Sequence, residues 1–244
     1  MIDSHAHILS EYYNIDELVK YLKSKNIKAV INCSTCLKDA NEIIELGDKY
    51  KEFLYPAIGI HPENIEDTLS EIEKLIINNK IYAIGEIGLD YYWNKENKDE
   101  QKDLFRKQIE LAIKYNLPII VHTRDSIQDT LNIIKDYKVK GVIHCFSGSY
   151  EMAVEFIKRG FKLGIGGVLT FKNSKLYEVI EKIDLKDIVL ETDSPYLTPE
   201  PNRGKKNDPS NVYYVAKRIS EIKNISIEEV MRITSENAKM IFDI

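Results

Sequence analysis

Short runs of aliphatic and β-branched residues alternate with longer amphipathic segments from one end of this chain to the other. Runs of the first kind predict buried strands, and apolar residues at helical spacing predict helices. The expected strands span residues 1–7, 29–33, 54–60, 82–87, 118–122, 141–145, 161–165 and 188–192. The expected helices span residues 14–25, 38–49, 63–78, 98–115, 126–136, 150–158, 175–183, 209–222 and 226–241. This regular alternation predicts parallel βα units.

The number of these units selects the fold class. Eight βα units in 244 residues match the size and rhythm of a (β/α)8 TIM barrel, whose active site forms at the C-terminal ends of its strands. A doubly wound open sheet is the main alternative, but its nucleotide-binding version carries a G-x-G-x-x-G turn after the first strand. This chain has His5 and His7 there instead. We therefore expect one α/β barrel domain over residues 1–244, with an extra C-terminal helix.

Composition narrows the class of protein further. The net charge of -5 argues against a nonspecific grip on long duplex DNA. No apolar run approaches the roughly 20 residues that span a bilayer, and the three cysteines are too scattered for a disulfide framework. We therefore expect a cytoplasmic monomer without membrane contact. On a strand, Cys145 is expected to point away from His144, toward the surrounding helices.

Polar side chains gather at the C-terminal ends of the expected strands. The histidines there are His5, His7, His61, His122 and His144, and the acids in similar positions are Glu86 and Asp193. A lone histidine at a strand end is more often a hydrogen-bonded packing residue than a ligand. In a closed barrel, however, all these side chains converge on one pocket. The period of two along a strand places His5 and His7 on the same face, with Asp3 beneath them.

This donor set predicts metal-dependent chemistry. Imidazole nitrogens and carboxylate oxygens form the ligand shell of hydrolytic divalent-metal sites. Four histidines and two acids exceed what one open catalytic ion needs, so the set fits a pair of ions bridged by a carboxylate. Glu86 is the best-placed bridge, because it is the only acid in an apolar strand and is flanked by Gly85 and Gly88. We expect two divalent ions per chain, and the donor set is compatible with Zn²⁺, Mg²⁺ or Mn²⁺.

Several longer motifs are distributed along the whole chain. They are DSHAH at 3–7, GIHPE at 59–63, GEIGLDYY at 85–92, IVHTRD at 120–125, HCFSGS at 144–149, ETDSPYL at 191–197 and PNRGKKNDPSNV at 201–212. Together they resemble the TatD-type metal-dependent deoxyribonucleases, within the amidohydrolase-like group of barrels. The resemblance implies a TIM barrel that hydrolyses DNA phosphodiester bonds with divalent metal, often as a 3′ to 5′ exonuclease.

The resemblance also implies roles for individual residues. The implied metal ligands are His5, His7 and Asp193 for one ion, His122 and His144 for the other, and Glu86 shared between them. Asp193 also takes the proton from the attacking water, because a carboxylate between metal and water suits general-base work. Asp193 and Glu86 are therefore the expected catalytic residues.

Three further residues are similar to substrate contacts in that family: His61, Arg124 and Arg203. Arg offers a bidentate fork for phosphate oxygens. His61 can instead hydrogen-bond the turn beside Pro62, and both interpretations stay open. The aromatic run 91–93 follows the Glu86 strand, where it can stack unpaired bases or pack against the neighbouring loop.

Three hypotheses for the function follow. The leading one is a two-metal 3′ to 5′ exodeoxyribonuclease that acts on single-stranded DNA, frayed ends or short oligonucleotides. A second keeps the metals but changes the substrate to a small ester, lactone or amide, because the same ions polarise a carbonyl group. Glu86 takes the position of the carboxylated lysine used elsewhere in the amidohydrolase group, which argues against the lactonase and phosphotriesterase branch. A third is a non-catalytic, metal-binding partner of a nuclease complex.

Overall fold

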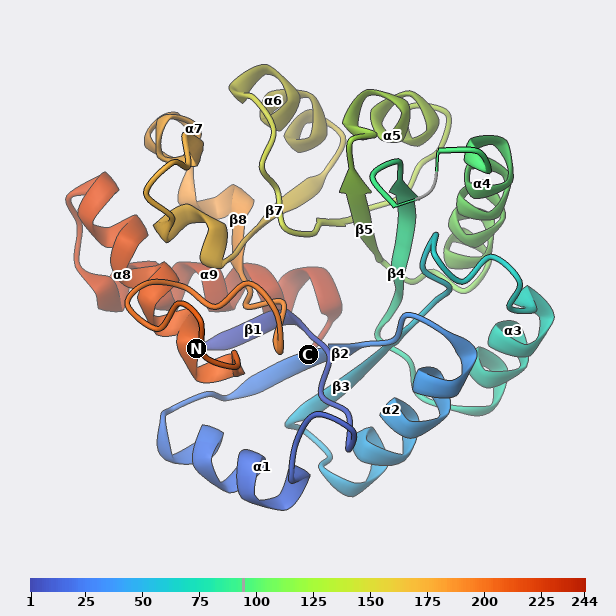
Figure 1. Cartoon of the computed structure of the whole chain (residues 1–244), viewed down its shortest axis with the longest axis horizontal. Coiled ribbons are helices and arrows are strands. Elements are labelled where there is room, and N and C mark those ends of the chain that lie inside the picture. The colour runs from blue at the N-terminus through green and yellow to red at the C-terminus, as the bar shows by residue number, and fades with distance from the viewer. Residues whose placement is uncertain (94) are drawn as a thin grey trace.

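Parallel strands follow one another in chain order around a barrel (Figure 1). The structure is a computed structural model that describes residues 1–93 and 95–244. Its strands are β1 (Ile2–Ala6), β2 (Ala29–Cys33), β3 (Leu54–Ile58), β4 (Ala83–Asp90), β5 (Ile119–Arg124), β6 (Gly141–Ile143), β7 (Phe161–Ile165) and β8 (Ile188–Leu190). The ring closes after β8, where Ala6 pairs with Ser194 and the His7 amide donates to the Ser194 carbonyl at 2.7 Å. The predicted (β/α)8 barrel is confirmed.

Helices surround this barrel on its outer side (Figure 1). They are α1 (Ile15–Ser24), α2 (Leu37–Lys49), α3 (Leu69–Asn78), α4 (Lys98–Lys114), α5 (Ile127–Ile134), α6 (Tyr150–Lys158), α7 (Leu176–Lys182), α8 (Val212–Lys223) and α9 (Ile227–Phe242). Short 3-10 helices span Gly167–Thr170, Leu185–Asp187 and Pro209–Asn211. The last of them is the first turn of the helix predicted over residues 209–222, whose α-helical part begins at Val212. In the described part of the chain, no helix has both the length and the apolar character needed to cross a membrane.

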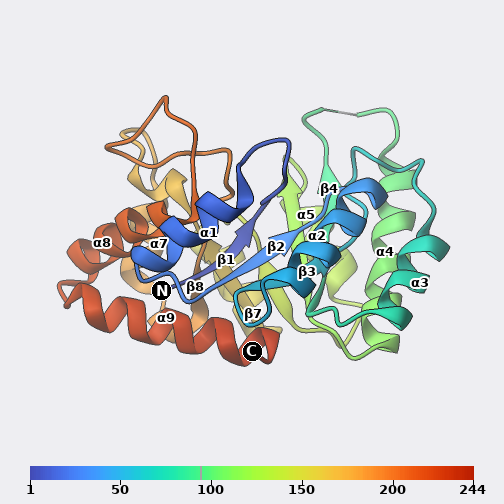
Figure 2. The same cartoon turned by 90° about the horizontal axis from the view of Figure 1, so that it is seen from below.

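Apolar side chains fill the space on both sides of the strands. An outer cluster packs strands against helices and includes Val30, Val121 and Ile109. An inner cluster joins alternate strand residues such as Ile31 to Phe242 of α9. Helix α9 lies across the N-terminal ends of the strands, opposite their tips (Figure 2). The interior is therefore closed by apolar packing at that end, and polar side chains can gather at the other.

Helix α3 is shorter than its predicted range of 63–78. It begins at Leu69, because the preceding residues form turns instead. The Asn64 amide donates to the His61 carbonyl at 2.8 Å, and the Asp67 carboxylate accepts from the Leu37 amide at 2.7 Å. These hydrogen bonds tie the loop after β3 to the start of α2 and keep His61 at the strand tips.

Strand β1 departs from a strict period of two. Its pairing with β2 shifts register between Asp3 and Ala6, which marks a β-bulge. Asp3 pairs with Val30, a member of the outer cluster, and its carboxylate accepts a hydrogen bond from the Thr192 amide at 3.0 Å. The expectation that Asp3 lies beneath His5 and His7 on their face is therefore wrong, because the bulge reverses the alternation.

Candidate metal centre

A cavity of about 670 Å³ opens at the C-terminal ends of the strands. The predicted site residues in its lining are His7, His61, Glu86, His122, Arg124, His144 and Asp193. His5 lies fully buried beside them, with its Nε2 atom 3.1 Å from His7 Nε2. The barrel thus brings all five histidines and both predicted acids together, from strands that lie far apart in the sequence.

Glu86 lies between two groups of histidines. Its Oε2 atom is 3.4 Å from His5 Nε2 and 3.5 Å from His7 Nε2. Its Oε1 atom is 2.8 Å from His122 Nδ1 and 3.6 Å from His144 Nε2. Burial favours the neutral acid, but the facing His144 and His5 imidazoles hold the pKa of Glu86 well below its usual value. Glu86 is therefore an anion with one oxygen toward each group.

The local geometry of His5 and His7 fits a cation. Two ring nitrogens that face each other at 3.1 Å offer two lone pairs unless a proton lies between them. The Oδ1 atom of Asp193 approaches both rings, at 3.6 Å from His5 Nε2 and 3.4 Å from His7 Nε2. Imidazoles and a carboxylate in this arrangement are the donor set of a divalent ion.

The groups of potential ligand atoms differ from the predicted partition. Four compact groups occur among the described residues: His5 with His7 and Asp193, His5 with Glu86 and His144, His61 with Glu86 and His122, and His144 with Cys145 and Glu191. The first is the predicted set for one ion. The predicted pairing of His122 with His144 is looser, because their ring centroids are 6.3 Å apart. Glu86 belongs to the second and third groups, in agreement with a shared position.

Gly88 allows β4 and β5 to approach closely at the site. Its φ of +145° is unfavourable for other residues, and an added Cβ would lie 2.0 Å from the His122 carbonyl oxygen. Strand β4 therefore continues beyond its predicted end at Ile87 and pairs with β5 as far as Asp90. This pairing sets Glu86 and His122 side by side.

Carbonyl or carboxylate oxygens lie behind three of the histidines, two of them as hydrogen-bond partners and the third as an ion-pair partner. His7 Nδ1 is 2.9 Å from the Cys33 carbonyl oxygen, and His122 Nε2 is 2.9 Å from Asp90 Oδ2. His144 Nδ1 contacts Glu191 Oε1 at 3.0 Å. In each ring the other nitrogen faces Glu86 or Asp193.

Two of these residues, Asp90 and Glu191, are not among the site residues predicted from the sequence. Both are buried acids at the C-terminal end of a strand, which is the same signal that identified Glu86. Asp90 was overlooked because the predicted strand stopped at Ile87. Glu191 lay inside the predicted eighth strand, two residues before the acid chosen at its end.

His61 makes the turn contact that one of its two interpretations predicted. Its Nδ1 atom accepts a hydrogen bond from the Glu63 amide at 3.2 Å, so the turn contact beside Pro62 exists. Burial and the nearby His122 lower the pKa of His61 to about 3, and the ring is neutral at physiological pH. With Nδ1 as acceptor, Nε2 carries the proton and points toward the cavity, 4.0 Å from Glu86 Oε1.

The two predicted arginines lie in different places. Arg124 lines the cavity, and its guanidinium lies 3.9 Å from the Tyr92 ring centroid and 5.4 Å from that of Trp93. Arg203 is not among the described residues that line the cavity; its guanidinium lies 3.9 Å from the Phe171 ring and donates to the Thr198 carbonyl. Its predicted phosphate contact is therefore not supported by its position.

The three aromatic residues that follow β4 lie in different environments. Tyr91 is buried and donates to Asp129 at 2.8 Å, so it packs against α5. Trp93 is 63% exposed and lines the cavity, with Tyr92 beside it.

Cys145 also lines the cavity beside His144, because β6 ends at Ile143 and Cys145 has a φ of 47°. The expectation that Cys145 points toward the helices is wrong.

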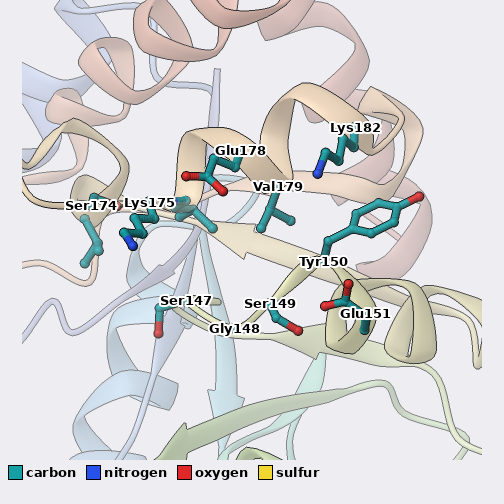
Figure 3. A pocket seen from close by; sticks show the side chains of 12 residues that line it. Ser147, Gly148, Ser149, Tyr150, Glu151, Ser174, Lys175, Glu178, Val179 and Lys182 are labelled. Atoms are coloured by element: carbon teal, nitrogen blue, oxygen red, sulfur yellow. Dashed lines mark hydrogen bonds between the residues drawn. The ribbon is translucent and has the colours of Figure 1, made fainter.

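A second hollow, of about 540 Å³, adjoins the first through Ser147, which lines both. Figure 3 shows Lys175, Glu178 and Lys182 on one side of it, and Ser147, Ser149 and Glu151, from the loop before α6 and the start of that helix, on the other. Lysines and glutamates both line this hollow. The mixture of charges sets it apart from the histidine and carboxylate cavity.

We expect metal binding to release protons and to strengthen as the pH rises. Burial opposes the charged form of His144, but the Glu191 and Glu86 carboxylates outweigh it and raise its pKa to about 10. Burial also opposes protonation of His122, but hydrogen bonds to Asp90 and Glu86 raise its pKa to about 9. At neutral pH both rings therefore carry a second proton, on the nitrogen that would bind metal, and a divalent ion must displace it.

Titration calorimetry in buffers of different ionisation enthalpy measures this proton release. We expect about one proton from each of His122 and His144, and a metal affinity that falls as the pH is lowered. An affinity that stays constant across the neutral range, without proton release, would contradict the assignment of these rings as ligands.

Fold and cavity together define a class of protein. A parallel eight-stranded barrel with histidines and acids around a cavity at the strand tips is the arrangement of barrel hydrolases that use divalent metal ions. The chain is a metal-dependent hydrolase.

Comparison with known proteins identifies the family. The model of the family described as TatD related DNase matches residues 2–243. The uncharacterized metal-dependent hydrolase YabD of Bacillus subtilis is 42% identical over 254 residues, covering 100% of this chain and 99% of YabD. Human deoxyribonuclease TATDN3 is 30% identical over 261 residues, covering 99% of this chain and 94% of that protein. The crystal structure of YJJV, a TatD homologue from Escherichia coli, matches with a TM-score of 0.94 at 27% identity, covering 100% and 98% of the two chains. This chain belongs to the TatD-related DNase family, as its motifs predicted.

Proposed function

We propose that this protein is a two-metal exodeoxyribonuclease that removes nucleotides from the 3′ end of single-stranded or frayed DNA. The family and the human relative named a deoxyribonuclease support DNA as the substrate. The position of Glu86 is the observation that carries the two-metal part of the proposal. Each of its oxygens faces a different group of histidines, as a bridging carboxylate must.

The proposed ligands are the two acids and four of the histidines: His5, His7, Glu86, His122, His144 and Asp193. When bound, a pair of divalent ions lowers the pKa of a water molecule and offsets negative charge on a phosphoryl oxygen. Asp193 accepts the proton of the attacking water. Its side chain is 15% exposed and so reaches the solvent of the cavity, whereas the Glu86 side chain is 4% exposed.

The substrate contacts are proposed from the cavity wall. His61 is neutral and offers its Nε2–H to a phosphoryl oxygen, because its Nδ1 is already the acceptor of the Glu63 amide. Arg124 lies at the same wall and brings a positive charge. These two donors orient a phosphate without adding a second base near Asp193.

The shape of the cavity favours a strand end as the substrate. Its volume of about 670 Å³ lies within the range of sites that enclose small molecules. His5 and the inner apolar cluster close it from below. A chain end fits such a closed site, whereas a continuous duplex needs an open groove.

The proposal is tested by metal content and by substrate comparison. Elemental analysis of the protein should find close to two divalent ions per chain. Turnover of a nitrophenyl phosphodiester should exceed turnover of nitrophenyl esters and of lactones. Preferential hydrolysis of esters or lactones would instead establish the small-molecule hydrolase, and a metal-loaded protein without turnover would establish a binding role.

Trp93→Ala should weaken the binding of single-stranded DNA. A base stacked on an exposed aromatic ring contributes about 1–3 kcal/mol, which corresponds to a rise in KM of roughly 5- to 150-fold. Steady-state kinetics on an oligonucleotide measure this change, and a nitrophenyl phosphodiester without a stacked base should keep its KM. Tyr177→Ala is the matched control, because Tyr177 is 43% exposed but lies on α7. An unchanged KM for DNA in Trp93→Ala would rule out stacking at this position.

A further inference from the structure

Glu191 is a buried carboxylate that the proposed reaction does not use. It follows β8 and is 0% exposed. Its Oε1 atom accepts a hydrogen bond from the Cys145 amide at 2.7 Å and contacts His144 Nδ1 at 3.0 Å. Neither its Oε2 atom nor His144 Nδ1 has a hydrogen-bond partner among the described residues, so the contact between Glu191 and His144 is an ion pair without hydrogen-bond geometry. A buried carboxylate is costly unless neighbouring groups compensate it, and the groups in contact with it here are the Cys145 amide and the His144 ring.

The contact with Glu191 determines which nitrogen of His144 faces the cavity. Because Nδ1 is turned to Glu191, Nε2 lies 3.6 Å from Glu86 Oε1 and 3.8 Å from Asp193 Oδ1. His122 has the opposite arrangement, with Nε2 held by Asp90 and Nδ1 toward Glu86. Glu191 contacts Nδ1 of His144, whereas Asp90 contacts Nε2 of His122. The nitrogen that faces Glu86 is therefore Nε2 in His144 and Nδ1 in His122.

We propose that Glu191 is a positioning residue, which holds the His144 ring so that Nε2 is the nitrogen available to an ion. A carboxylate behind a ligating histidine fixes the ring and its tautomer and makes the other nitrogen a better ligand. This inference rests on the metal-binding role of His144 in the proposed function. It assigns Glu191 no contact with substrate or ion.

Gly164 of β7 provides the space that the Glu191 carboxylate occupies. A Cβ at this position would lie 2.1 Å from Glu191 Oε2 and 3.2 Å from the Ile143 carbonyl oxygen. Gly164→Ala therefore displaces the carboxylate without removing its charge. At Gly166, in contrast, an added Cβ would lie 3.4 Å from both Cγ and Oε1 of Glu191, which are ordinary contacts that need no displacement, so Gly166→Ala is the matched control.

An alternative role for Glu191 is direct metal binding with its neighbours. His144, Cys145 and Glu191 have potential ligand atoms within 4.8 Å of one another. The Cys145 amide donates to Glu191 Oε1 at 2.7 Å, so this carboxylate oxygen already has a partner without any ion. Cys145→Ser distinguishes the two roles, because it removes the sulfur and keeps the backbone amide that donates to Glu191.

The test measures the dissociation constant of Mn²⁺ and the tautomer of His144. Glu191→Gln and Gly164→Ala should each raise the Kd of the more weakly held ion about 10- to 100-fold. Gly166→Ala and Cys145→Ser should leave it unchanged. In protein loaded with diamagnetic Zn²⁺, long-range ¹H–¹⁵N spectra should show the proton of His144 on Nδ1 alone, and this pattern should be lost in Glu191→Gln and kept in Gly166→Ala.

Unchanged Kd values in both Glu191→Gln and Gly164→Ala would overturn the proposal, and so would an equal loss in Gly164→Ala and Gly166→Ala. A loss in Cys145→Ser as large as in Glu191→Gln would make the group a metal site instead. If the unaltered protein bound no Mn²⁺, the proposed function would fail first. If it bound Mn²⁺ and the variants matched it, only the role of Glu191 would fail.

Discussion

Glu86→Gln should lower kcat/KM on single-stranded DNA by about three orders of magnitude, because the two ions supply several kcal/mol of transition-state stabilisation. The substituted amide keeps the size of the side chain but has one oxygen instead of two. It therefore cannot face the His5 and His7 pair and the His122 ring with an anionic oxygen each, as Glu86 does. We expect the loss of activity to accompany a loss of bound metal.

Elemental analysis and the rate of oligonucleotide digestion measure both effects on the same preparation. Glu221→Gln is the control, because Glu221 makes an exposed ion pair with Arg218 on α8, away from the cavity. A Glu86→Gln protein that keeps its full metal content and its activity would show that Glu86 is not the bridge.

Asp193→Asn should lower kcat about 10²- to 10⁴-fold, the usual contribution of a general base. Burial raises the pKa of Asp193, but the hydrogen bond from His7 and the charge of His144 outweigh it, and the net pKa lies below the usual value. The carboxylate is therefore ionised at neutral pH and ready to accept a proton. Asn lacks the charge and cannot accept the proton, whereas it can still contact His5 and His7.

Backbone conformation is controlled in this substitution. Asp193 has a φ of 56°, which Asn also adopts readily. Asp243→Asn is the matched control, because Asp243 has a φ of 55° at the end of α9, far from the site. Single-turnover kinetics with saturating metal should show the loss in Asp193→Asn alone. A loss confined to KM, with kcat unchanged, would assign Asp193 to binding and not to proton transfer.

The sequence was sufficient for the barrel because each element carried its own signal. Runs such as residues 29–33 and 161–165 became strands with the predicted bounds, and Ser226 accepts a hydrogen bond from the Glu229 amide at the start of α9. Local periodicity predicted the wrong start for α3, where tertiary hydrogen bonds determine the backbone conformation. Residues 63–68 have helical spacing, but the Asp67 contact with the start of α2 holds them in turns.

The candidate site was predictable in its membership and less so in its detail. Seven polar residues at strand ends were expected to converge, and they do. The side that Asp3 faces was not predictable, because a β-bulge leaves no periodic signal. The location of Arg203 depends on the path of the loop after β8, which no local pattern specifies. Asp90 and Glu191 needed the strand ends to be placed correctly before their contacts with His122 and His144 could be inferred.

The most direct test of the two-metal nuclease is digestion of single-stranded DNA labelled at the 3′ or the 5′ end. The protein is used as purified, after chelation, and after chelation followed by added Mn²⁺. We expect immediate release of the 3′ label as a mononucleotide, loss of this release after chelation, and its recovery with Mn²⁺. Full digestion by the chelated protein, with elemental analysis showing no remaining ion, would contradict the proposed function.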